Sequence, residues 1–233
     1  MRIDRNLALI ADKSLYDIWI RLSFGVASLE AIEARLGKIL AINSTSEKVL
    51  ANLKSMKLSS QELIVWKVKV DRDNKAYLEI LHKFSPDPMK TLAEIKAETK
   101  SILEILNKLD PGASADDVEL LANAKWIRLN TDLEPLIVSD DRDILTCCHI
   151  FSSFFGLTMG FLSGFEILRL MELDESFVEY CRYYSLDVDA RRISDVWSKE
   201  KLEREFSNAM RKAKLTCHPN LRRNDSIMRI VRR

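Results

Sequence analysis

Two short aspartate clusters in the second half of the chain have the composition of a divalent-metal site. They are Ser-Ala-Asp-Asp at residues 114–117 and Ser-Asp-Asp at residues 139–141, and a third acid, Asp12, ends an apolar run near the start. Hard divalent cations such as Mg²⁺ prefer carboxylate and other oxygen ligands. If the three segments meet in the fold, they supply the ligands of a carboxylate-lined metal site.

Each cluster also has the composition of a helix start. A Ser or Asp at the N-cap stabilises a helix by about 0.5 to 2 kcal/mol without any function, and acids in the first turn add to this. For either cluster alone, capping is the simpler interpretation. The position of Asp12 at a predicted strand end, in the right chain order, favours a common site. An ordinary α/β protein whose acids are all caps stays open as an alternative.

Apolar runs that alternate with helical patterns predict an α/β protein with a mainly parallel sheet of about five strands between two helical layers. Strands are expected at residues 7–11, 38–42, 63–70, 135–139 and 157–161, with 63–70 at an edge. Helices are expected over 14–36, from 43 onward, in two pieces over 73–109, after 114, from 141 and again beyond 171. In such sheets the functional crevice lies beyond the carboxyl ends of the strands, where Asp12 and residues 139–141 are predicted to lie.

The charge distribution divides the chain into a near-neutral body and a basic tail. Residues 1–170, the predicted α/β domain, hold 22 Lys and Arg against 24 Asp and Glu, and residues 171–233 form a predicted helical extension. Its last part, 211–233, holds eight basic residues against one acidic residue. A basic tail suggests a polyanionic partner such as RNA, although a solvated helix end that binds nothing stays open. The candidate RNA contacts are Arg222, Arg223, Arg229, Arg232 and Arg233.

The class of the protein follows from three further features. No secretory signal opens the chain, and the four cysteines form no CxxC pair. Residues 144–165 contain no Asp, Glu, Lys or Arg, but glycines and serines at turn-like positions favour a helix, a turn and a strand over a membrane span. We therefore expect a cytoplasmic protein with reduced thiols and no membrane association.

The segments 114–124 and 135–145 resemble the second half of PIN domains. Asp-Asp-Val-Glu-Leu-Leu-Ala-Asn-Ala is similar to the helix start of that family, and Leu-Ile-Val-Ser-Asp-Asp-Arg-Asp is similar to its acidic strand end. Asp12 matches the opening strand end, and residues 156–166 match the closing strand and helix. The resemblance spans residues 7–170, and its specific part is 114–145.

This resemblance implies a ribonuclease whose Asp12, Asp117 and Asp141 hold Mg²⁺ or Mn²⁺, with Ser139 as the hydroxyl beside the last acid. The family has a further acid in a helix where this chain has Asn52. The loss of that carboxylate is expected to weaken metal binding, and Glu47 could replace it only with a shifted geometry. Asp140 and Asp143 are expected to be solvated neighbours. The supporting candidates are Ser139, Asp140, Asn52 and Glu47.

Two functions therefore stay open for the PIN-like fold. The first is an endoribonuclease. The second is a catalytically weak or inactive RNA-binding or assembly module, as Asn52 would allow. A homodimer and a protein partner also stay open.

Overall fold

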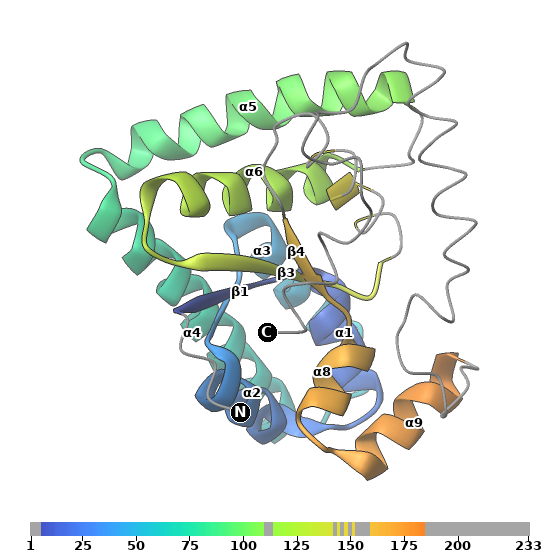
Figure 1. Ribbon diagram of the computed structural model, residues 1–233. Helices are drawn as coiled ribbons and strands as arrows, with labels where there is room; N and C mark the ends of the chain where they lie inside the picture. Colours follow the sequence, from blue (N-terminus) through green and yellow to red (C-terminus); the bar gives the residue numbers. More distant parts are fainter. Residues whose placement is uncertain are drawn as a thin grey trace.

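The computed structural model describes residues 6–109, 114–141, 144, 147, 148, 151 and 159–184. In this part of the chain, four parallel strands form one sheet with the order β2-β1-β3-β4 (Figure 1). The strands are β1 (Leu7–Ala11), β2 (Lys38–Leu40), β3 (Glu134–Val138) and β4 (Gly160–Leu162). The predicted α/β class with a parallel sheet is confirmed, and the described residues contain four of the five expected strands.

Helices make up most of the described chain. In chain order they are α1 (Lys13–Arg21), α2 (Gly25–Leu36), α3 (Asn43–Leu53), α4 (Ser60–Phe84), α5 (Pro88–Leu109), α6 (Ala115–Asn130), α8 (Gly164–Leu170) and α9 (Asp174–Tyr184). The break between α4 and α5 lies at the expected Ser-Pro-Asp-Pro segment, because a proline is tolerated at the first turn of a helix but not in its interior.

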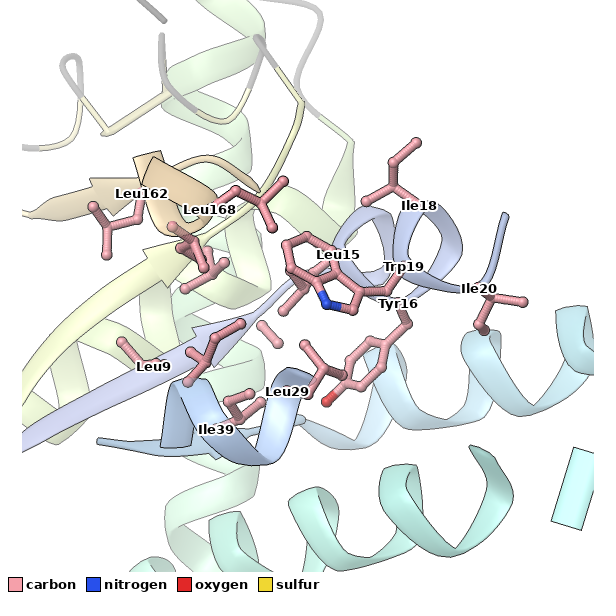
Figure 2. Packing of buried hydrophobic residues seen from close by; sticks show 14 of the residues in the cluster. Leu9, Leu15, Tyr16, Ile18, Trp19, Ile20, Leu29, Ile39, Leu162 and Leu168 are labelled. Carbon is pink, nitrogen blue, oxygen red and sulfur yellow. The ribbon is translucent and has the colours of Figure 1, made fainter. Parts of the chain in front are cut away.

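Both faces of the sheet are covered by helices because the strands are apolar on both sides. Ala8 and Ile10 of β1 pack in one buried cluster with residues of α5 and α6. Leu7, Leu9 and Ala11 of the same strand pack in a second cluster with α1, α2, α8 and α9. Figure 1 shows α5 and α6 above the sheet and α2 and α8 below it. Figure 2 shows Tyr16 and Trp19 pointing from α1 into the second cluster.

The predicted edge strand at residues 63–70 is wrong, because this segment is part of the 25-residue helix α4. A capping box starts the helix: Ser59 Oγ accepts from the Glu62 backbone N–H, and Glu62 accepts from the Ser59 N–H at 2.8 Å. The alternating apolar residues Ile64 and Val68 are 62% and 61% exposed. The buried face of α4 instead has the helical period, and its members are Trp66, Lys69, Val70, Asp73, Tyr77 and Leu81.

A buried ionic cluster joins α4 to α1 and α2. Lys69 Nζ contacts a carboxylate oxygen of Asp73 and lies 3.1 Å from Glu33 Oε2, and the Lys69 side chain is fully buried. Tyr16 Oη donates to Asp73 Oδ2 at 2.8 Å. Burial raises the pKa of Asp73 to about 6, against the opposing effect of Lys69. This cluster gives α4 polar residues on its inner face.

The same helix also covers the free edge of β2. The N–H of Ala41 donates to the carbonyl of Asp73 at 3.2 Å, and the Asn74 side chain donates to the carbonyl of Ala41 at 2.9 Å. Backbone groups next to the edge strand are therefore satisfied by α4, where the sequence had suggested another strand.

The structure tests only part of two expectations, the absence of a membrane span and the state of the cysteines. In the ranges that are described, no helix is both long and apolar enough to cross a membrane. Cys147, Cys148 and Cys181 are buried, and Cys217 lies outside the described residues.

Candidate active site at the carboxyl ends of the strands

The carboxyl ends of β1 and β3 bring Asp12 beside residues 139–141. Ala11 pairs with Val138 in the parallel register, and the Asp12 N–H donates to the carbonyl of Val138 at 2.8 Å. Because both strands end at the same edge of the sheet, Asp12 meets Ser139, although 127 positions separate them in the chain.

Two serines hold the Asp12 carboxylate, Ser139 through its hydroxyl and Ser14 through its backbone N–H. Ser139 Oγ donates to Asp12 Oδ2 at 3.0 Å, and the Ser14 N–H donates to the same oxygen at 3.1 Å, so that Asp12 is also the N-cap of α1. The two hydroxyl oxygens lie 3.1 Å apart, and Ser139 Oγ accepts from the Asp141 N–H at 2.9 Å. Both contacts of Asp12 use Oδ2, so the carboxylate can keep them and bind a ligand through its other oxygen.

Asp117 reaches the same place from α6. It is the third residue of that helix and forms a capping box with Ser114, whose N–H donates to Asp117 Oδ2 at 2.8 Å. Its pKa is raised, first by burial and then by the charges of Asp141 and Asp12, against the lowering effect of the Ser114 hydrogen bonds. Asp141 and Asp12 are therefore close enough for their negative charges to act on Asp117.

These three aspartates line one pocket of about 340 Å³. Its walls come from α1, α3, α6, α9 and the end of β3. Besides Asp12, Asp117 and Asp141, the lining residues are Lys13, Ser14, Asp17, Ile18, Arg21, Thr45, Lys48, Ser114, Asp116, Leu120, Tyr183 and Tyr184. The pocket thus combines carboxylates with three basic side chains, two of them in ion pairs: Lys13 with Asp17 and Lys48 with Asp116.

Sequence reasoning missed Asp17, which brings a further carboxylate to the pocket. Asn52 Nδ2 donates to Asp17 Oδ2 at 3.2 Å, and Lys13 Nζ lies 2.6 Å from the same oxygen. Asn52 therefore contacts the pocket through Asp17, whereas Glu47 is exposed on α3 and does not line the pocket. The signal for Asp17 was the charged stripe of α1, in which Lys13, Asp17 and Arg21 recur at i, i+4 spacing.

The donor set fits a hard divalent cation by its chemistry, because five aspartates line the pocket and carboxylate oxygens are the ligands that such a cation prefers. The carboxylates are engaged in helix caps and ion pairs, however. Within the described ranges, no group of three or more His, Cys, Asp or Glu side chains is gathered closely enough to hold a metal ion. Binding of a cation would require these side chains to turn toward one another.

Asp140 accepts hydrogen bonds from residues of two helices and is not the solvated neighbour that we expected. One of its oxygens, Oδ1, accepts from the Gly164 N–H at 2.8 Å and from the Tyr180 hydroxyl. Its other oxygen is buried without a hydrogen-bond partner among the described residues. Asp140 therefore ties the end of β3 to α8 and α9, and burial raises its pKa to about 6.

The raised pKa of Asp140 predicts an unusual pH dependence of stability. Between about pH 4 and pH 6 the folded protein keeps a proton on Asp140 that the unfolded chain has released, so this group makes the protein less stable as pH rises. The free energy of unfolding of the wild type, relative to that of Asp140→Asn, should fall by about 2 kcal/mol between pH 4 and pH 7. Urea unfolding of both proteins across this range measures the difference, and a constant difference would contradict the assignment.

Several predicted site residues lie outside the described part of the chain. They are Asp143 and the candidate RNA contacts Arg222, Arg223, Arg229, Arg232 and Arg233.

Comparisons with known proteins place the chain in no family. No family model, no curated protein and no solved structure matches it. The resemblance to PIN domains therefore stays a prediction that the residues themselves suggest.

Proposed function

We propose that this protein is a PIN-like, metal-dependent ribonuclease that hydrolyses phosphodiester bonds of RNA. The observation that supports it is the pocket at the carboxyl edge of a parallel sheet, which Asp12, Asp117 and Asp141 line from three distant parts of the chain. That edge is where α/β proteins bind their ligands.

The carboxylates of Asp12, Asp117 and Asp141 are the groups that would hold Mg²⁺ or Mn²⁺. When bound, such an ion lowers the pKa of a water molecule and stabilises the charge that builds on a phosphate. Ser139 positions Asp12 through its 3.0 Å hydrogen bond, and Asn52 positions Asp17.

The basic side chains of the pocket suit a phosphate backbone. Lys13 and Lys48 pair with Asp17 and Asp116 across partly exposed surfaces. The Lys48–Asp116 pair is exposed on both sides, and such a pair is worth about 0 to 1 kcal/mol, so Lys48 can exchange its partner for a phosphate at little cost. Arg21 adds a third cation to the wall of the pocket.

The test is cleavage of an end-labelled RNA by the full chain with Mn²⁺, compared with the same reaction in EDTA. Cleavage that requires the metal supports the proposal. RNA that stays intact at high enzyme concentration in Mn²⁺ would contradict it.

A second candidate function, an RNA-binding module with little or no chemistry, is favoured by two observations. Asn52 stands where the resemblance implies an acid, and the described carboxylates are not gathered around one point. Salt-sensitive RNA binding without any cleavage in Mn²⁺ would select this function, because phosphate contacts weaken as salt concentration rises.

A further inference from the structure

Helix α9 places two tyrosines in the wall of the carboxylate pocket. Tyr183 and Tyr184, in its last turn, line the same pocket as Asp12 and Asp117. Their side chains are partly open to solvent, with exposed fractions of 46% and 36%. Large aromatic side chains that are exposed beside a polar pocket offer flat apolar surface to a ligand.

Helix α9 is anchored in the core through Phe177 and Tyr180, which precede Tyr184 on the same helix face, and this fixes where the two tyrosines lie. The Phe177 ring packs against Phe165 of α8 with a centroid distance of 4.9 Å, and the Tyr180 hydroxyl donates to Asp140. Both Phe177 and Tyr180 are buried. The last turn of α9 is therefore held at the pocket by contacts that do not involve Tyr183.

The rings of Tyr183 and Tyr184 contact each other edge to face, and one arginine contacts Tyr183. The ring centroids of Tyr183 and Tyr184 lie 5.0 Å apart at an interplanar angle of 85°, and Tyr180 lies 4.8 Å from Tyr184. Arg21 Nη1 donates to the Tyr183 hydroxyl at 3.3 Å. Flat rings next to a cation are what a nucleotide requires, since the base stacks on an aromatic face and the phosphate meets the positive charge.

We propose that Tyr183, with the ring of Tyr184 packed edge to face against it, is a base-stacking platform that holds a nucleotide of an RNA strand next to the carboxylates. The proposal rests on the proposed function for the identity of the strand, but it does not require that the strand is cut. The platform lies on α9, so residues after the predicted α/β domain supply part of the binding surface.

The test is equilibrium binding of a fluorescently labelled oligouridylate to the full chain in EDTA, measured by anisotropy. Tyr183→Ala should weaken binding by about 5- to 100-fold, the range expected when one stacked base loses its aromatic partner. Tyr183→Phe should bind within about twofold of the wild type, since it keeps the ring and loses only the hydroxyl. Val178→Ala is a matched control, because Val178 is exposed on the same helix and does not line the pocket.

An abasic strand of the same length separates stacking from phosphate contact. The platform predicts that Tyr183→Ala and the wild type bind this strand equally well. Equal binding of oligouridylate by the two proteins would overturn the proposal, as would an equal loss for the abasic strand or no binding by the wild type. If the tyrosine dependence is found and RNA is never cut in Mn²⁺, the platform stands and the ribonuclease proposal fails.

Discussion

Asp117→Asn and Asp141→Asn should each lower Mn²⁺-dependent RNA cleavage by about a hundred- to a thousandfold. A bound metal ion supplies several kcal/mol of transition-state stabilisation, and about 1.4 kcal/mol corresponds to a factor of ten in rate. Loss of one negative ligand from the pocket removes a large part of this effect. Initial rates on an end-labelled RNA at saturating Mn²⁺ measure the change.

The fold should survive the Asp117 substitution. The asparagine oxygen can still accept from the Ser114 N–H, which the aspartate does at 2.8 Å. Because the pKa of Asp117 is raised, its ionised form costs stability near neutral pH, and the neutral amide removes this cost. The melting temperature of Asp117→Asn at pH 7 should therefore equal or exceed that of the wild type, whereas this advantage should disappear at low pH.

Glu119→Gln on the same helix is the control for the cleavage assay, because Glu119 does not line the pocket. It should cleave RNA at the wild-type rate. Full activity in Asp117→Asn would show that the pocket is not the centre of the reaction.

Lys69→Met should destabilise the protein by about 3 to 5 kcal/mol at pH 7. The substitution leaves Asp73 and Glu33 without their buried cation, and breaking a buried ion pair on one side costs about this much. Urea unfolding at pH 7 measures the loss. A value within about 1 kcal/mol of the wild type would contradict the role of the cluster.

The effect of Lys69→Met should decrease at low pH. Removal of the lysine raises the pKa of Asp73 further, since Lys69 opposes the effect of burial. The folded variant then takes up a proton on Asp73 as pH falls, and part of the lost stability returns.

Two further variants distinguish the effect of the buried Lys69–Asp73 pair on stability from the effect of surface charges. Lys69→Met combined with Asp73→Asn should recover most of the loss, because the amide oxygen can accept from Tyr16. Arg72→Ala removes contacts to Glu30 and Glu33 that lie at the surface, and should cost less than about 1 kcal/mol.

This cluster also explains why the sequence predicted a strand in place of the first half of α4. Lys67 and Lys69 alternate with Trp66, Val68 and Val70, so these apolar residues look like the buried side of a strand whose lysines face solvent. In the structure Lys69 and Asp73 are buried together, and Ile64 and Val68 lie on the exposed side. Asp73 lies four residues after Lys69, pairs with it and accepts a hydrogen bond from Tyr16 of α1. These contacts make the charged side of this segment the buried side.

The continuous apolar strands were predictable because burial on both faces leaves little ambiguity. Residues 7–11 match β1, and 135–139 match β3 with a shift of one residue, since such runs fit a parallel sheet with helices on both sides. That sheet alone brings Asp12 to Ser139. The charged stripe of α1 marks Asp17 in the sequence, but its place beside the pocket depends on how α1 packs against Asn52 of α3.

The most direct test of the account is a crystal of the full chain soaked in Mn²⁺ and measured for anomalous scattering. We expect a peak in contact with the carboxylates of Asp12, Asp117 and Asp141, with the side chain of Asp117 turned away from Ser114. A structure in which Asp117 keeps its capping contacts with Ser114 and the manganese lies elsewhere, or does not bind, would contradict the account.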